Sequence, residues 1–452
     1  MPELFRPGLT DHGLQDLRGI AVDVAAAGMA ATDPAKALKE QVFLDGDELC
    51  LPDRTFDLSA YNRIWVVGAG KATGTLAQAM EGILGDRVTG GLVVVREGSA
   101  VPLRNLRLLE AEHPLPGRGS IAAGRAVLEV ADKVGAEDLV ISLVTGGSSS
   151  LVCVPAGHIT AHEKRDLHRR LLSSGANIEE INTVRKFTSG VKGGKLAERF
   201  GCATIINLSV SDVAGDPEQY ICDLTVRNDE LSSQAIDVLR RYQLWEVVAA
   251  SVREVLEKSE TRLPSLEGID IHTHMLVTGR SVCHAMVDEA VRQGIAGVVI
   301  GTEMCGPAAG IGAMLAGLAM ESARRGVLFP VPCVLVACGG ESTVVLTDPN
   351  SFGKGGPNQE LAVAAATRLS ATDRVALLAI DTDGSDGGTD ACGALIDSTT
   401  ARRAREMGVD LHQALSIHET HDALNAIHDL IITGPTQTNV NDLIVVAIGR
   451  ET

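Results

Sequence analysis

The sequence is poor in basic residues and in aromatic side chains. It has 40 Lys and Arg against 58 Asp and Glu, which gives a formal net charge of −18 at pH 7. A protein that binds nucleic acid needs a basic surface to neutralise phosphates, so this balance argues against nucleic acid as the main partner. Aromatic residues make up only 3% of the chain, whereas 45% of it is hydrophobic and 48 residues are Gly. This composition favours helices packed on buried strands over a disordered or fibrous chain.

Long apolar runs and metal-type cysteine patterns are also missing. No run of about 18 uncharged apolar residues occurs, and the first residues lack an apolar core of signal-peptide length. The nine cysteines include no Cys-x-x-Cys pair and no companion histidines at zinc spacing. We therefore expect a soluble, cytoplasmic protein without a membrane segment, whose thiols are reduced and mostly buried.

Strand-like and helix-like segments alternate along the chain. Apolar runs at 63–67, 91–95 and 138–144 are separated by helical patterns and predict a βαβαβ unit. Further strands are expected at 203–210, 273–278, 297–301, 331–338, 343–347, 375–380 and 442–448. The length favours two or three domains, and the apolar-poor segment 258–268 is the best candidate for a boundary.

An acidic turn follows the apolar run 375–380. Residues 381–390 contain four aspartates, Asp381, Asp383, Asp386 and Asp390, interleaved with glycines. Crowded carboxylates repel one another at a cost on the order of several kcal/mol, so we expect a metal, a magnesium-bound nucleotide or basic side chains to converge there. A solvated Asp-Gly turn is the alternative interpretation. The position after a strand favours a ligand site in an open α/β sheet.

Two glycine turns follow the first and third strands. Gly68-x-Gly70 precedes Lys71, but the next glycine is at 74, which is displaced from the dinucleotide-binding pattern, and the spacing excludes a P-loop. A lysine in the first turn of a helix is stabilised by an anion, so we expect a phosphate or carboxylate contact for Lys71, with a tight structural turn as the alternative. The second turn can present consecutive N–H groups to an oxyanion, unless it is a flexible loop; it consists of Gly146, Gly147, Ser148 and Ser149.

Charged residues cluster after these turns. Residues 181–195 gather four cations with three glycines, which indicates an anion site more readily than a solvated helix face. Asp212 and Asp216 follow the strand expected at 203–210, where one could accept a proton and the other could hold Mg²⁺; capping of the next element is the alternative. Further Gly-rich turns contain Glu341 and Asn358.

These motifs, taken in order, resemble the glycerate 2-kinases of the MOFRL type, some members of which are labelled hydroxypyruvate reductase. The resemblance covers nearly the whole chain and rests on their joint occurrence. The motifs are Gly-Ala-Gly-Lys-Ala at 68–72, Thr-Gly-Gly-Ser-Ser at 145–149, Lys-Gly-Gly-Lys at 192–195, Gly-Gly-Glu-Ser-Thr at 339–343, Gly-Gly-Pro-Asn-Gln-Glu at 355–360 and Thr-Asp-Gly-Ser-Asp-Gly at 382–387.

The resemblance implies an α/β fold with a Rossmann-like N-terminal domain, residues 1–262, and a smaller α/β domain, residues 263–452. It implies that ATP and Mg²⁺ meet glycerate in a cleft between them. Asp212 is then expected to act as the base and Asp216 as the metal ligand. Lys71 and Lys195 are expected to contact phosphate or the substrate carboxylate. Cofactor contacts are expected from Gly68, Gly70, Gly146, Gly147, Ser148, Ser149, Glu341, Asn358, Asp383 and Asp386.

Two departures from the family pattern bear on the substrate. Pro357 stands where family members commonly have an arginine, and residues 222–225 read Cys-Asp-Leu-Thr in place of Ser-Gly-Pro-Thr. We expect both changes on turns that line the cleft, which leaves a related sugar acid open as the substrate. An NAD(P)H-dependent hydroxypyruvate reductase, using Gly68-x-Gly70 and Arg96-Glu97, and a non-catalytic sugar-acid binding protein remain alternatives. The sequence leaves both a monomer and a homodimer open.

Overall fold

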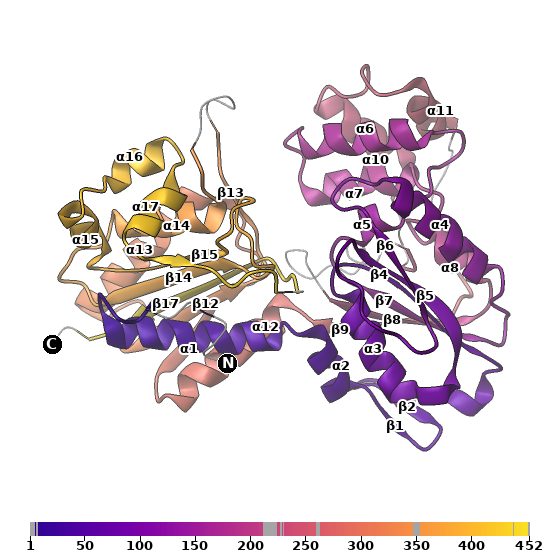
Figure 1. The fold of residues 1–452 in the computed structure, drawn as a ribbon, viewed down its shortest axis with the longest axis horizontal. Coiled ribbons are helices and arrows are strands. Elements are labelled where there is room, and N and C mark those ends of the chain that lie inside the picture. Colours follow the sequence, from indigo (N-terminus) through magenta and orange to yellow (C-terminus); the bar gives the residue numbers. More distant parts are fainter. Residues whose placement is uncertain are drawn as a thin grey trace. The chain divides into compact units, whose positions relative to one another are not determined.

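The chain folds into two compact units (Figure 1). The computed structural model describes residue 5 and residues 8–210, 224–226, 228, 230–258, 263–346, 353–436 and 438–450. The central unit consists of residues 34–210 and 224–276, and the terminal unit combines the residues up to 33 with those from 277 onward. The chain therefore leaves the terminal unit after residue 33 and returns at residue 277. This division differs from the expected single boundary between residues 262 and 263.

The central unit contains a six-stranded sheet in which the strand order reverses once. Its order is β6 (Arg107–Ala111), β5 (Val88–Arg96), β4 (Ile64–Ala69), β7 (Leu139–Val144), β8 (Thr204–Val210) and β9 (Ile271–Val277). The pairs from β6 through β8 are parallel. The chain moves outward from β4 to β6, then returns to β7 and continues the other way. This order is typical of dinucleotide-binding domains and confirms the Rossmann-like prediction.

Helices cover both faces of this sheet. On one face, apolar residues of α4 (Arg118–Ala131) and α8 (Lys195–Phe200) pack on β4, β5 and β7. On the other face, α3 (Thr73–Leu84) approaches β5 so closely that a Cβ on Gly74 would lie 3.3 Å from Cγ1 of Val95. α2 (Pro34–Gln41) packs beside α3. Both faces of the strands are thus buried, which explains their continuous apolar runs.

Four helices form a separate apolar core within the central unit. They are α6 (Ala161–Leu172), α7 (Ile178–Phe187), α10 (Ser232–Arg241) and α11 (Ala250–Lys258). A small antiparallel sheet consists of β1 (Phe43–Asp45), β2 (Glu48–Cys50) and β3 (Thr55–Asp57). The short helix α5 (Ser148–Leu151) follows β7 directly. The helical core positions the basic segment of α7 and the loop that follows it.

The sheet of the terminal unit is mixed. Its order is β10 (Ala296–Gly301), β12 (Cys333–Cys338), β17 (Asp442–Ile448), β14 (Val375–Asp381), β15 (Gly393–Asp397) and β16 (Leu430–Ile431). β17 is antiparallel to both β12 and β14, so it begins at the edge where they end. The strand expected at 343–347 appears only as the two-residue β13 (Ser342–Thr343), which pairs with β11 (Gly306–Pro307).

Two groups of helices enclose this sheet (Figure 1). One face is covered by α13 (Ala308–Arg325), α14 (Pro357–Ala366), α15 (Thr400–Glu406), α16 (Leu411–Ser416) and α17 (Thr420–Ala426). The other face is covered by α1 (Gln15–Ala31) and α12 (Gly279–Arg292). Gly28 of α1 is close-packed there, since a Cβ would lie 2.8 Å from atoms of Leu443 and Met286. In the part of the chain described here, no helix has the length and apolar character needed to cross a bilayer.

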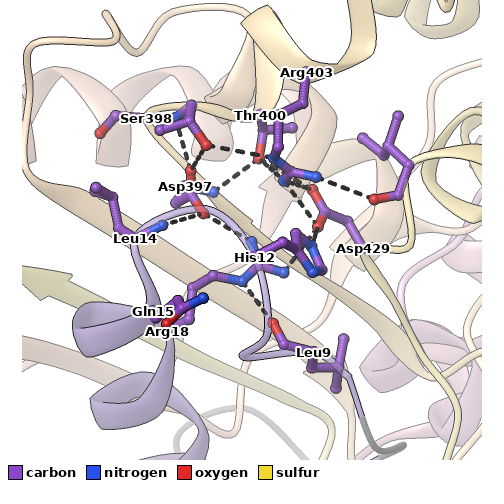
Figure 2. Close-up of polar contacts among 12 residues, drawn as sticks. Leu9, His12, Leu14, Gln15, Arg18, Asp397, Ser398, Thr400, Arg403 and Asp429 are labelled. Carbon is purple, nitrogen blue, oxygen red and sulfur yellow. Dashed lines mark hydrogen bonds and ion pairs between the residues drawn. The ribbon is translucent and has the colours of Figure 1, made fainter. Parts of the chain in front are cut away.

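A buried ion-pair network fixes α1 to the terminal unit (Figure 2). The guanidinium of Arg18 donates to Asp397 Oδ2 at 2.9 Å, to Asp429 Oδ1 at 2.8 Å and to the carbonyl oxygen of Leu9 at 2.6 Å. Arg403 donates to the other oxygen of Asp429 at 2.7 Å. The side chains of Arg18 and both aspartates are fully buried. These contacts explain why the N-terminal helix belongs to this unit and not to the one that follows it in sequence.

Candidate functional site

The turn after β4 lies against the turn after β7. Gly70 has a φ of +147°, and a Cβ there would lie 2.1 Å from Thr145 Oγ1. The backbone N–H of Lys71 donates to the carbonyl oxygen of Gly146 at 2.9 Å. Thr145 Oγ1 accepts from the N–H of Ala72 at 3.1 Å. Only glycine fits such a close approach, so the first turn is held at the edge of the sheet where the strand order reverses.

Gly147 brings a lysine and a histidine to this edge. Its φ is +90°, and a Cβ would lie 3.0 Å from the ring of His113 and 3.3 Å from Cγ of Lys71. In the left-handed region a non-glycine residue is strained. The side chains of Lys71 and His113 therefore both lie beside the backbone of Gly147, which is partly exposed.

A second lysine reaches the same turn from another loop. Lys192 Nζ donates to Ser149 Oγ at 3.0 Å, and Lys192 is only 1% exposed. Ser150 Oγ instead donates back to the carbonyl oxygen of Gly147. The predicted turn 146–149 therefore lies between Lys71 and Lys192, in a geometry suited to an oxyanion.

Positive charge is concentrated beneath this turn. Lys164, Arg185, Lys186 and Lys192 are all buried. Burial, reinforced by the nearby charges of Lys192 and Arg185, lowers the pKa of Lys164 to about 7. Glu230 offsets part of the charge by accepting from Lys186 Nζ at 3.1 Å. Buried cations are stabilised by negative partners, so the cluster favours an anionic ligand.

Lys195, one of the predicted contact residues, bonds to backbone groups of its own part of the chain. Its Nζ donates to the carbonyl oxygens of Lys186 and Ser189. The ammonium thereby stabilises the C-terminal end of α7, where backbone carbonyls are left over. A contact between Lys195 and substrate or phosphate stays a prediction.

The predicted base and metal ligand lie outside the described residues. Asp212 and Asp216 follow β8, whose Ser209 is paired with Val144 of β7. β8 therefore ends at the same sheet edge as the turn that begins at Thr145. Their assignment as base and metal ligand stays a prediction.

Carboxylates gather at the corresponding edge of the terminal unit. Asp381 at the end of β14 is paired with Asp442 at the start of β17. Asp386 accepts the backbone N–H groups of Asn358 and Gln359 at 3.0 Å each, so it caps the first turn of α14. Asp442 accepts from Asn358 Nδ2 at 2.6 Å, and it also accepts an N–H and an O–H from Ser342 at 2.7 Å.

Hydrogen-bond donors and protonation relieve the repulsion among these aspartates. Burial, together with the charge of Asp383, raises the pKa of Asp381 to about 8. Burial also raises the pKa of Asp386 to about 6 and raises that of Asp442. Among the described residues, no three His, Cys, Asp or Glu side chains form a group that could hold a metal ion. One basic side chain does reach the acidic turn, since Lys354 Nζ pairs with Asp390 Oδ1 at 3.1 Å. The more buried Asp386 and Asp442 are bonded by amide and hydroxyl donors, and a metal or nucleotide at this turn stays a prediction.

Two residues of the central unit lie at this turn but were not among the expected contact residues. His113 lies beside Gly147, and Lys192 contacts Ser149. Lys192 stands in the predicted basic segment between glycines, so its motif could have identified it. His113 is 34 residues from Gly147 in sequence, so its proximity depends on the parallel sheet.

The comparisons with known proteins cover nearly the whole chain. Residues 20–257 match the model of a domain of unknown function, DUF4147, and residues 333–442 match the MOFRL family. A glycerate 2-kinase of Pyrococcus horikoshii is 34% identical over 96% of this chain and 98% of its own length. The crystal structure of a glycerate kinase from Thermotoga maritima has a TM-score of 0.83 at 33% identity, covering 96% of this chain and all of that one.

The chain belongs to the MOFRL-type glycerate kinase family. A relative in Agrobacterium vitis, 37% identical over 86% of this chain and 100% of its own, is named "Putative hydroxypyruvate reductase". Both names therefore occur among relatives of similar identity.

The two departures from the glycerate kinase pattern fall in different environments. Pro357 is the first residue of α14 and lines a cavity of the terminal unit. Thr225 is fully buried, and its hydroxyl donates to Asn207 Oδ1 at 2.6 Å and lies 3.2 Å from Ser142 Oγ. Thr225 is common to both patterns, and Leu224, the changed residue beside it, is buried in the apolar core of the sheet. The expectation that this turn lines a cleft stays a prediction. Cys222 lies outside the described residues.

Proposed function

We propose that this protein is a glycerate 2-kinase, which transfers the γ-phosphoryl group of ATP to the 2-hydroxyl of D-glycerate. Family membership over nearly the whole chain supports the reaction class, since relatives named for this activity align end to end with it. Phosphoryl transfer depends on positioning and charge neutralisation more than on covalent catalysis. The central unit has the features that such a reaction needs.

The observation that carries the proposal is the meeting of Lys71, His113 and Gly147 where the strand order reverses. Ligands of open α/β sheets bind outside the carboxyl ends of the strands at such a point. The partly exposed backbone at Gly147 and the Ser149 hydroxyl bonded by Lys192, with the adjacent N–H of Gly146, would hold phosphate oxygens. Lys71 would neutralise charge that develops on the transferred group.

The proton and the metal are assigned to residues that follow β8. Asp212 would accept the proton of the 2-hydroxyl of glycerate. The hydroxyl oxygen then bonds to the γ-phosphorus of ATP, and the bond between that phosphorus and ADP breaks. Mg²⁺, when bound, neutralises phosphate charge and orients the phosphates. Asp216 is proposed as its ligand, and Lys195 as a contact for the substrate carboxylate. Support for these assignments is the position of the end of β8 beside Thr145.

Nucleotide contacts in the terminal unit are proposed for Glu341, Asn358, Asp383 and Asp386. Asn358 offers the best support, because it is 1% exposed and its Oδ1 accepts no hydrogen bond from the described residues. Asp386 has less support, since both of its oxygens already accept N–H groups of α14.

A hydroxypyruvate reductase is the second candidate. Its support is the dinucleotide-type strand order and the relative that bears that name. Against it, Gly74 lies inside α3, one position beyond the glycine of the dinucleotide-binding pattern. A basic cluster of the observed size is also more than a dinucleotide requires, because a pyrophosphate can bind through a helix N-terminus alone.

Two assays on the full chain separate these functions. ATP, Mg²⁺ and D-glycerate should yield ADP and 2-phosphoglycerate, and NADH should not be oxidised with hydroxypyruvate. Asp212→Asn should lower kcat at least a hundredfold, in line with loss of a general base. ADP production unchanged in Asp212→Asn would reject that base. Absence of turnover across a panel of sugar acids would favour a non-catalytic binding protein.

A further inference from the structure

The terminal unit contains a cavity of about 400 Å³ that the proposed catalytic residues do not use. Sites for small molecules span roughly 300–1,000 Å³, so its volume is sufficient for a ligand. Its walls come from the strand end after β13, the loop before α14, the turn after Asp386 and the turn between α16 and α17.

Glycine backbone forms much of the wall. A Cβ on Gly387 would lie 2.2 Å from the carbonyl oxygen of Gly355, and a Cβ on Gly355 would lie 2.3 Å from Thr420 Oγ1. The three residues are thus packed together without side chains between them. Val344 and Leu346 line the cavity as well. Peptide planes and aliphatic side chains of this kind suit a flat ring.

Two polar features point to a ligand with hydrogen-bond donors. Glu360 is 5% exposed, and its Oε2 pairs with His418 Nδ1 at 2.7 Å. Thr420 is 1% exposed, and its Oγ1 has no hydrogen-bond partner among the described residues. A buried hydroxyl without a partner is unfavourable by about 1–3 kcal/mol, so a ligand that bonds it would gain affinity.

The charge of the lining selects against an acidic ligand. The buried charged group is the Glu360 carboxylate, whereas Lys354 is about half exposed and pairs with Asp390 at 3.1 Å. The carboxylate of glycerate would be repelled. A nucleoside is uncharged and presents ribose hydroxyls and ring amines that Glu360 and Thr420 can accept from.

We propose that this cavity binds the nucleoside of the ATP, with the base against Val344, Leu346 and the glycine wall, and with Glu360 and Thr420 bonding the nucleoside's polar groups. The proposal rests on the proposed use of ATP. It assigns a site to the base and the ribose.

Calorimetric titration of the full chain with adenosine and with ADP tests it. Thr420→Val removes a hydroxyl that has no protein partner, so the fold should be retained while affinity falls roughly threefold to tenfold. Glu360→Gln should weaken binding about tenfold. Thr367→Val is the matched control, because the Thr367 hydroxyl bonds only its own helix, to Ala364 O at 2.8 Å, and does not line the cavity.

Photolabelling tests separately where the nucleoside binds. Photolabelling with 8-azidoadenosine should mark peptides that carry Val344, Leu346 or the loop 353–357. The site would be rejected if the label marked other peptides or if the unmodified chain bound no adenosine. It would also be rejected if Thr420→Val and Glu360→Gln bound adenosine as tightly as the unmodified chain. Adenosine binding that responds to these variants without phosphorylation of glycerate would instead reject the proposed function and leave the nucleoside site standing.

Discussion

At the scale of single residues, the site of the central unit depends on glycines at positions where a side chain is unfavourable. Gly70 and Gly147 adopt positive φ values; a Cβ on Gly70 would clash with Thr145, and a Cβ on Gly147 would press on His113 and Lys71. Their absence of side chains lets Lys71 and His113 reach the same turn. A substitution there should disturb the site through contact as well as through backbone strain.

Gly147→Ala should lower kcat/KM for glycerate phosphorylation at least tenfold. The added Cβ would press on His113 and Lys71 in addition to the left-handed strain, which is about 1–2 kcal/mol. Gly175→Ala is the matched control, because Gly175 has a φ of +81° with nothing within 4 Å of its Cβ position. Steady-state kinetics and urea unfolding of both variants check the prediction, which fails if the two lose equal activity.

Asp381→Asn should stabilise the terminal unit at pH 8. The pKa of Asp381 is raised to about 8 in the folded state, so the folded chain binds more protons than the unfolded one between about pH 4 and 8. Stability contributed by this group is present at low pH and is lost as the pH rises through that window. Asparagine stays uncharged at pH 8, so the free energy of unfolding of Asp381→Asn at pH 8 should exceed that of the unmodified chain by about 1–3 kcal/mol.

Unfolding in urea at pH 5 and pH 8 measures the effect of Asp381→Asn. Asp390→Asn is a control of opposite sign, because hydrogen bonding from Lys354 lowers the pKa of Asp390. A variant whose stability falls more steeply between pH 5 and pH 8 than that of the unmodified chain would contradict the prediction.

At the scale of elements, long apolar strands were predictable, and short strands or strands that carry charged residues were not. β7 and β14 are continuous apolar runs, and the sequence predicts both within a residue or two. β6 is an edge strand with charged residues at 107 and 110, and β15 is a short run that follows the acidic turn; the sequence analysis predicts neither. Short or half-exposed strands lack the apolar run on which such predictions rest.

The acidic turn 381–390 also shows how far the sequence alone predicts the candidate site. Its position after β14 follows from the sequence, but the donors to Asp386 come from Asn358 and Gln359, about 27 residues earlier. A carboxylate cluster identifies crowded charge and does not say what relieves it. The glycine turns after β4 and β7 were easier to predict from the sequence, because the positive φ that favours glycine is a local property of the chain.

Asp386→Ala should lower the stability of the terminal unit by about 1–3 kcal/mol. It removes the acceptor for two N–H groups at the start of α14. If Asp386 serves this cap and binds no metal, the Mg²⁺ concentration for half-maximal activity should stay unchanged. Unfolding in urea and magnesium titration of activity check the two parts. An increase of tenfold or more in the magnesium requirement would indicate a metal contact.

At the scale of the whole molecule, the N-terminal helix completes the unit formed by the C-terminal half of the chain. Arg18 bonds Asp397 and Asp429, which are about 380 and 410 residues away. The central unit is thus an insertion between two parts of the terminal unit. Its six strands in Rossmann-like order and the helical core need no residue before position 34.

Arg18→Met should destabilise the terminal unit and spare the central one. Removing Arg18 takes the arginine partner from the buried Asp397, whereas Asp429 keeps Arg403, and breaking a buried ion pair costs about 3–5 kcal/mol. Asp16→Asn is the control, since the Asp16 contact with Arg374 is partly exposed and such pairs contribute about 0–1 kcal/mol. Hydrogen exchange should rise in β14, β15 and β17 and stay unchanged in β4 and β7. Equal loss of protection in both units would contradict this prediction.

The most direct test of the central claim is ³¹P NMR of the full chain with ATP, Mg²⁺ and D-glycerate, alongside Lys71→Met. The unmodified chain should convert the γ-phosphate signal into that of 2-phosphoglycerate and ADP, and Lys71→Met should slow the conversion at least a hundredfold. No phosphoglycerate from the unmodified chain, or an undiminished rate in Lys71→Met, would contradict phosphoryl transfer at the turns that follow β4 and β7.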